Sequence, residues 1–173
     1  VNKYNNLGSD YIPSDLVDLK QQYRTKANKL KRIANEYFEK MADAAKQDGI
    51  TLYVGSGYRS YATQQSLYNY YISRDGLAEA NTYSAKPGYS EHQTGLAIDI
   101  SDKSYTFIED NTTEYKWLVN NSYKYGYILR YTKEKEKITG YMFEPWHYRY
   151  VGIDIATYIY ENDLTYDEYV ARK

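Results

Sequence analysis

Tyrosine is the residue that most constrains this chain, because 25 of its 173 residues are tyrosines. A mean hydropathy of −0.82 and a charged fraction of 26% would by themselves indicate a chain too polar to fold. Each tyrosine ring can bury on the order of 150–250 Å² while its hydroxyl finds a partner. We therefore expect a single globular domain over residues 1–173, with tyrosine in much of its core and residues 1–23 as an N-terminal lead-in that wraps the domain.

Charge and cysteine content exclude several classes of function. The 22 basic and 23 acidic residues leave a net charge of −1, so no nucleic-acid partner is expected. The absence of cysteine excludes a disulfide scaffold, a thiolate nucleophile and a cysteine-based metal site. No apolar run approaches the roughly 20 residues that span a bilayer, and the first ten residues lack a basic-then-apolar signal, so we expect a soluble piece without a transmembrane segment.

The order of predicted elements indicates an α+β fold with a small, mostly antiparallel sheet and flanking helices. Apolar residues at helical spacing predict a helix over 24–48, closed by Gly49; they are Leu30, Ile33, Ala34, Tyr37, Phe38, Met41 and Ala45. Further helices are predicted over 61–74, 112–125 and 153–172, and strands over 50–54 and 96–100. The runs GYILRYT and GYMFEPWHYRY, joined by KEKEKITG, predict a hairpin, and 84–95 is a loop.

Each of the two histidines has a carboxylate nearby in the sequence. His92 precedes Asp99 by seven residues, and alternation in the strand 96–100 turns Asp99 away from the face that carries Ile98 and Ile100. A carboxylate in such a strand is costly to bury unless a cation or hydrogen-bond donors meet it.

The second histidine follows a proline turn. If Pro145 begins a turn, Glu144 and His147 lie on one side of the chain. Two imidazoles and a carboxylate form a common zinc set, and a further carboxylate can act as a base. The spacing leaves other interpretations open: His92 as a surface histidine, His147 as a packed one and Asp99 as a hydrogen-bond acceptor at the strand end.

Three segments together resemble the VanY-type family of zinc carboxypeptidases that act on peptidoglycan. They read SGYRSYATQQ (56–65), SEHQTGLAID (90–99) and EPWHYR (144–149), in the family's order, and the resemblance spans roughly residues 12–160. The family includes the D,D-carboxypeptidases of vancomycin resistance and the L,D-carboxypeptidases of the LdcB/DacB type. The resemblance implies a zinc site at the sheet and its adjoining loops.

The resemblance also implies residue roles. His92, Asp99 and His147 would bind one zinc ion, and Glu144 would be the general base. Arg59 would hold the terminal carboxylate of the substrate, which suits a planar guanidinium. Further substrate contacts would come from Ser56, Gln64, Ser90 and Trp146. Two other interpretations stay open, a surface ion pair for Arg59 and a purely structural role for Trp146 behind His147.

The resemblance implies a zinc-dependent L,D-carboxypeptidase that removes the C-terminal D-alanine from stem tetrapeptides. The alternative is a D,D-carboxypeptidase acting on pentapeptides that end in D-Ala-D-Ala, since the motifs encode metal and carboxylate recognition only. An L,D enzyme needs room for the long side chain of the third stem residue, whose ammonium group an acid such as Glu91 or Asp102 would meet. The alternative interpretation of both acids is as solvated charges. An endopeptidase would have no use for Arg59, and a wall-binding domain would have none for Glu144.

A peptidoglycan substrate implies a location outside the cytoplasmic membrane. We expect a cell-wall or membrane-anchored ectodomain, with its signal or anchor outside this sequence. The Tyr-, Asn- and Lys-rich composition favours a Gram-positive source, and we expect a monomer.

Overall fold

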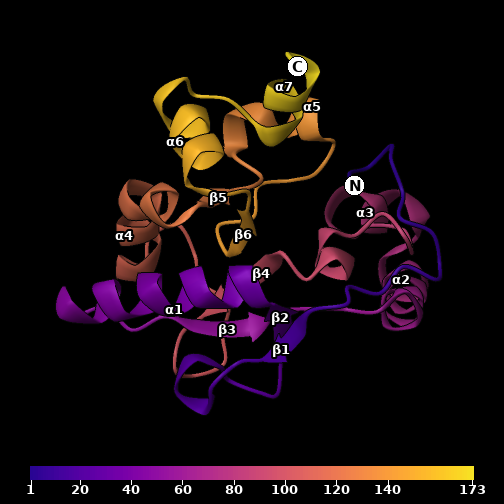
Figure 1. Cartoon of the computed structure of the whole chain (residues 1–173). Helices are drawn as coiled ribbons and strands as arrows, with labels where there is room; N and C mark the ends of the chain where they lie inside the picture. The colour runs from indigo at the N-terminus through magenta and orange to yellow at the C-terminus, as the bar shows by residue number, and fades with distance from the viewer.

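The computed structural model describes residues 1–173 as an α+β fold, so the predicted class is confirmed (Figure 1). A four-stranded antiparallel sheet has the order β3-β4-β6-β5, and a two-stranded sheet pairs β1 with β2. The strands are β1 (Leu16–Asp18), β2 (Lys29–Lys31), β3 (Tyr53–Ser56), β4 (Ala97–Ser101), β5 (Tyr127–Leu129) and β6 (His147–Tyr150). The helices are α1 (Arg32–Gln47), α2 (Tyr61–Asp75), α3 (Leu77–Tyr83), α4 (Thr113–Asn121), α5 (Glu136–Thr139), α6 (Ile153–Glu161) and α7 (Tyr166–Ala171).

The first predicted helix begins later than its apolar pattern indicates. Helix α1 starts at Arg32, and Leu30 lies in β2, where it is fully buried. Ile33 is 41% exposed, so its placement on the apolar face was wrong. The buried face of α1 instead comprises Ala34, Phe38, Met41, Ala42 and Ala45. The strand pairing of β1 with β2 fixes residues 29–31 as extended, and tertiary pairing therefore overrides the helical spacing there.

The predicted hairpin pairs as expected, but its connection differs. Strands β5 and β6 are antiparallel, with Leu129 opposite Tyr148. The connection holds the 3₁₀ helix η4 (Lys133–Lys135) and helix α5, and the strand begins only at His147. The predicted C-terminal helix is divided into α6 and α7. Gly49 follows the end of α1, as predicted, and Gly126 ends the 3₁₀ helix η3 (Ser122–Tyr125).

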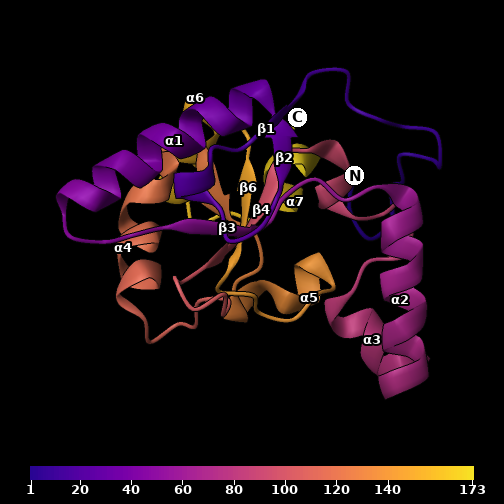
Figure 2. The same cartoon turned by 90° about the horizontal axis from the view of Figure 1, so that it is seen from below.

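Figures 1 and 2 show how the helices surround the sheet. Helix α1 runs along the sheet beside β3, α5, α6 and α7 gather toward the C-terminal end, and α2 with α3 forms a pair set to one side. The N-terminal residues reach the loop before β4, because the amide of Leu7 donates to the Gly88 carbonyl (2.9 Å). No helix of the structure has the length and apolar character needed to cross a membrane.

Tyrosine contributes to the core, but less than its abundance predicts. The main cluster of 16 buried residues includes Tyr23, Tyr127 and Tyr148. Tyr127 and Tyr148 lie in the adjacent strands β5 and β6 and are both 0% exposed. Their hydroxyl groups differ: that of Tyr127 donates to the Ala34 carbonyl (2.7 Å), whereas that of Tyr148 has no hydrogen-bond partner.

This difference predicts that two matched substitutions change the free energy of unfolding differently. Tyr127→Phe removes a buried hydrogen bond and should lower the free energy of unfolding by about 1 kcal/mol. Tyr148→Phe removes a buried hydroxyl without a partner and should be neutral or slightly stabilising. Urea unfolding followed by circular dichroism measures both. Equal losses of stability in the two variants would contradict the assignment of their hydroxyl groups.

Candidate active site

Asp99 lies on the inner strand β4, and its two neighbours across the sheet are also predicted site residues. The register places Asp99 opposite His147 on β6 and opposite Ser56 on β3. Directly paired residues of antiparallel strands point to the same face. The pairing with β3 shifts between Val54 and Ser56, so one extra residue, Gly55, forms a bulge. The bulge turns Ser56 toward the face that carries Asp99, a common use of bulges beside functional sites.

His92 reaches Asp99 from the 3₁₀ helix η2 (Glu91–Thr94), just before β4. Its Nε2 lies 3.2 Å from Asp99 Oδ2, and its Nδ1 lies 2.7 Å from the Gly57 carbonyl oxygen. The carbonyl accepts a hydrogen bond from the Nδ1–H group, which leaves the Nε2 lone pair facing Asp99. Gly95 ends η2 with a φ of +69°, and a Cβ there would lie 2.9 Å from Leu16, so a larger residue would displace this turn.

His147 completes the group that can hold a metal ion. Its Nδ1 lies 3.1 Å from Asp99 Oδ1, and its Nε2 lies 3.3 Å from Glu91 Oε2. One donor atom each of His92, Asp99 and His147 lies within 4.8 Å of the others, and all three residues are buried. Each imidazole thus points one nitrogen toward Asp99 and the other toward a second acceptor. This donor set fits zinc, which two imidazoles and one carboxylate commonly bind.

The pKa values of the two imidazoles shift in opposite directions. Burial lowers the pKa of His92, and the nearby Arg59 adds to that effect. Burial acts in the same direction on His147, but hydrogen bonds with Asp99 and Glu91 prevail and raise the pKa of His147 to about 9. His147 therefore lies between two carboxylates, which favour the protonated form of its imidazole more than the surroundings of His92 do.

The predicted turn places Glu144 beside His147. The His147 amide donates to the Glu144 carbonyl (3.2 Å), which closes a turn over Pro145 and Trp146. Glu144 Oε2 then lies 3.6 Å from His147 Nδ1. Burial, reinforced by the negative charges of Asp99 and Glu91, raises the pKa of Glu144 to about 8. Its carboxyl group therefore exchanges a proton near neutral pH.

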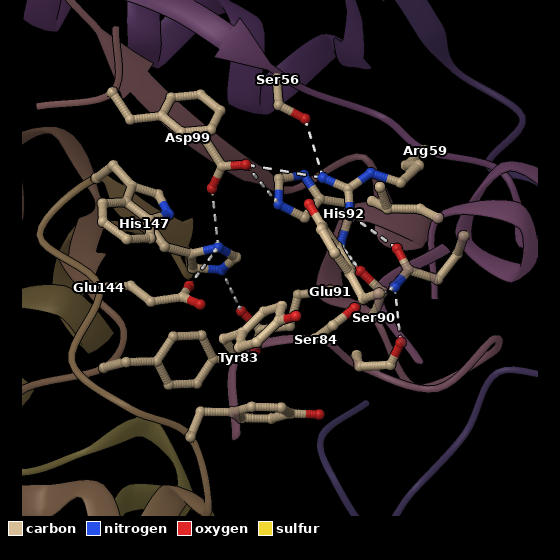
Figure 3. Close-up of a pocket in the computed structure, with 18 of the residues that line it drawn as sticks. Ser56, Arg59, Tyr83, Ser84, Ser90, Glu91, His92, Asp99, Glu144 and His147 are labelled. Carbon is tan, nitrogen blue, oxygen red and sulfur yellow. Dashed lines mark hydrogen bonds and ion pairs between the residues drawn. The ribbon is translucent and has the colours of Figure 1, made fainter. Parts of the chain in front are cut away.

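Arg59 occupies the other side of Asp99, as Figure 3 shows. Its guanidinium lies 3.7 Å from Asp99 Oδ2 and donates to Ser56 Oγ (3.1 Å) and Gln64 Oε1 (2.7 Å). The Arg59 amide donates to the His92 carbonyl (3.1 Å), which ties its backbone to η2. Ser60 then caps α2 through its hydroxyl, which accepts from the Thr63 amide (3.2 Å). These contacts hold the guanidinium in the pocket with 18% of its side chain exposed.

The remaining predicted residues all line the same pocket of about 630 Å³. Gln64 is 1% exposed, and its amide nitrogen donates to the Ala85 carbonyl (2.6 Å), which directs its oxygen toward Arg59. Ser90 Oγ accepts from the His92 amide (3.3 Å), so it also caps η2. Trp146 is half-buried and stacks on Phe107 (centroids 5.9 Å apart).

Of the two acids considered for an ammonium group, only Glu91 lines the pocket. Glu91 is buried, and Arg130 and Arg149 pair with its carboxylate at 2.8 and 3.2 Å. Asp102 accepts from the amides of its own turn and does not line the pocket. The hypothesis that either meets a substrate ammonium is therefore not supported by its surroundings. The ion pairs of Glu91 were not predicted from the sequence. A signal for them exists, because Arg130 and Arg149 lie in the strand segments ILRY and HYRY, where an arginine is typical of a buried ion pair.

Comparison with known proteins agrees with this geometry. Residues 27–153 match the VanY family model, described as D-alanyl-D-alanine carboxypeptidase. A Bacillus subtilis (strain 168) protein, YodJ, whose name assigns it provisionally to the carboxypeptidases, is 45% identical over 177 residues; the match covers 98% of this chain and 65% of YodJ. The chain thus spans less than two thirds of that relative.

Two solved structures are similar over nearly the whole chain. The L,D-carboxypeptidase LdcB has a TM-score of 0.90 and 42% identity, covering 99% of this chain and 84% of that one. The vancomycin-resistance D,D-pentapeptidase VanY, solved with Zn(II), has a TM-score of 0.81 and 37% identity, covering 98% and 96%. The resemblance found in the motifs and the expectation of a zinc site are confirmed.

The donor set predicts zinc binding that depends on Asp99. The wild-type chain should retain about one zinc ion after desalting, and Asp99→Ala should retain almost none, because three protein ligands are needed to hold the ion. Inductively coupled plasma mass spectrometry measures the content. Asp102→Ala is the matched control, since it removes a nearby carboxylate outside the pocket. Equal zinc in both variants would place the ion elsewhere.

Proposed function

Since this chain belongs to the VanY family of D-alanyl-D-alanine carboxypeptidases, we propose that it is a zinc-dependent L,D-carboxypeptidase that removes the C-terminal D-alanine from peptidoglycan stem tetrapeptides. Its substrate would lie outside the cytoplasmic membrane, in the cell wall. One domain over residues 1–173 would carry the whole site. A monomer suffices, because every proposed site residue comes from the same chain.

The observation that carries this proposal is the position of Arg59 beside the metal group. Arg59 lies 3.7 Å from Asp99, so a carboxylate paired with the guanidinium stands next to the metal position. A guanidinium fork pairs both oxygens of a carboxylate in one plane. A substrate held in this way would present its last peptide bond to the metal, which is the requirement of a carboxypeptidase.

Each residue of the site has a separate role in the proposed reaction. Zinc held by His92, Asp99 and His147 supplies Lewis acidity, which makes water more acidic and a peptide carbonyl more electrophilic. Glu144 removes a proton from the attacking water and passes it to the leaving amine of D-alanine. Arg59 holds the departing carboxylate, and Ser56 and Gln64 orient the guanidinium. Ser90 and Trp146 line the same pocket and are proposed as further substrate contacts.

The L,D assignment is supported by the likeness to LdcB, which has both the higher TM-score and the higher sequence identity of the two structures compared. The second candidate is D,D-carboxypeptidase activity on pentapeptides. The family description and the likeness to the D,D-pentapeptidase VanY favour it. Both reactions use the same metal group and the same carboxylate clamp, so they differ only in the residue that precedes the terminal D-alanine.

Two other functions fit the site less well. An endopeptidase cuts inside the stem peptide and gains nothing from Arg59 beside the metal group. A zinc-stabilised wall-binding domain would keep the ligands but has no need for a buried glutamate at Glu144.

Purified muropeptides test the proposal directly. Zinc-loaded protein should remove one alanine from a disaccharide tetrapeptide and leave the pentapeptide intact, as measured by mass spectrometry. Glu144→Gln should lower kcat by about 10²–10⁴-fold, because the proton acceptor is lost. EDTA should abolish the reaction, and added zinc should restore it. Trimming of the pentapeptide alone would assign D,D activity, and trimming of neither by zinc-loaded protein would overturn the catalytic assignment.

The Arg59 clamp makes a separate prediction about the free C-terminus. A tetrapeptide amide should be a poor substrate for the wild-type protein, because it lacks the carboxylate that Arg59 pairs. Arg59→Met should reduce kcat/KM for the free acid by an amount equivalent to about 2–5 kcal/mol, the cost of removing one partner of a buried charge pair.

For the amide the same variant should change kcat/KM little, so the preference for the acid should disappear. Asp102→Ala is the control and should keep the wild-type preference. An undiminished preference in Arg59→Met would assign carboxylate recognition to another residue.

A further inference from the structure

Glu91 is a buried carboxylate for which the proposed reaction has no direct use. Its side chain is 1% exposed, and it is the residue immediately before His92. Figure 3 shows it on the side of His147 away from Asp99. Burial of an unpaired carboxylate costs several kcal/mol, so its partners reveal what keeps it there.

The two carboxylate oxygens of Glu91 have separate partners. Oε1 accepts from Arg130 Nε (2.8 Å) and pairs with Arg149 Nη1 (3.2 Å). Oε2 faces Nε2 of His147 (3.3 Å). The two guanidinium groups offset the charge of the buried carboxylate. One oxygen is thus committed to the arginines, and the other is directed at the imidazole.

The imidazole of His147 must present Nδ1, and not Nε2, to the metal position. Nδ1 is the nitrogen that lies 3.1 Å from Asp99. A neutral imidazole carries one proton, and a metal ion held at Nδ1 would leave that proton on Nε2, where the Glu91 carboxylate can accept a hydrogen bond from it. A carboxylate beside Nε2 therefore favours the tautomer whose Nδ1 lone pair is free for a metal, and it also fixes the plane of the ring.

We propose that Glu91 is a positioning residue that holds His147 with its proton on Nε2 and its Nδ1 toward the metal. His92 has the corresponding contact with a neutral acceptor, the Gly57 carbonyl (2.7 Å). The two ligands are therefore oriented by different acceptors, one a backbone group and one a carboxylate. The inference depends on the metal group of the proposed function but not on its substrate.

Zinc affinity of the whole chain tests the proposal. In Glu91→Gln the amide offers one acceptor oxygen, which cannot serve both Arg130 and His147. We expect zinc affinity to fall by about 10–100-fold, the usual effect of losing an acceptor behind a histidine ligand. Competition with a fluorescent chelator measures it, without any substrate. Unchanged affinity in a folded variant would overturn the proposal.

Asp167→Asn is the matched control. Asp167 accepts from Arg130 Nη1 (2.8 Å) and does not line the site pocket. The substitution weakens the buried charge cluster and should lower the melting temperature, while zinc affinity stays within about twofold of wild type, since the Glu91 contact with His147 remains. An equal loss of affinity in both variants would reduce Glu91 to a general stabilising role and overturn the proposal.

Exchange of the imidazole N–H protons with water provides a second measurement, which a change in overall stability alone would not alter. The chain has only two histidines, so a ¹H–¹⁵N spectrum of the zinc-loaded protein resolves both rings. In wild type we expect two protected imidazole protons, on Nδ1 of His92 and on Nε2 of His147. In Glu91→Gln the His147 proton should exchange with water faster, while the His92 proton persists as an internal reference. Retention of both signals would contradict the proposal.

If Glu91→Gln fails to fold, Glu91→Asp replaces it in both experiments. Aspartate keeps the charge that Arg130 and Arg149 require but is one methylene shorter, so it cannot reach His147 while paired with the arginines. The same losses of zinc affinity and of His147 proton protection are expected. A failed activity assay with these results intact would reject the substrate assignment and leave the role of Glu91 standing.

Discussion

The carboxylate of Asp99 is the constraint on which the rest of the site depends. It lies on the inner strand of the sheet with 7% of its side chain exposed, and a charge in such a place is tolerated only when partners surround it. Its partners come from three different parts of the chain: His92 from the loop before β4, His147 from β6, and Arg59 from the connection between β3 and α2. The sheet register brings Ser56 and His147 to the level of Asp99, and the Gly55 bulge is what turns Ser56 toward it.

Carboxylates alternate with nitrogen-bearing side chains from Asp99 toward the C-terminal helix. Beyond Asp99 come the imidazole of His147, the carboxylate of Glu91, the guanidinium of Arg130 and the carboxylate of Asp167 at the start of α7. Each member is compensated by its neighbours, so a row of ionisable groups can be buried beside the apolar core. That core is mainly aliphatic, and Tyr127 and Tyr148 add aromatic surface to it.

Local patterns in the sequence predicted the parts of the site that depend on neighbours along the chain. Alternation in β4 placed Asp99, and the turn at Pro145 brought Glu144 to the side of His147. Contacts between segments that are far apart in the sequence could not be predicted from the sequence. Residues 24–31 have helical spacing but contain a strand, because β1 pairs with β2, and Glu91 suggested a solvated acid until the fold brought Arg130, 39 positions later, against it. The three motifs of the VanY family could be placed without the fold, whereas the acceptor behind each histidine could not.

The distance between the guanidinium of Arg59 and the metal group has a consequence for where a substrate could be cut. Arg59 cannot recede from Asp99, because its amide is bound to the His92 carbonyl and its side chain to Ser56 and Gln64. A carboxylate that pairs with it would therefore lie no more than one residue from the metal position. A peptide bond farther inside a stem would have no terminal carboxylate within reach, and the guanidinium would be left without its partner in the pocket. The spacing that allows Arg59 to offset part of the charge of Asp99 is thus the same spacing that would limit hydrolysis to the final residue.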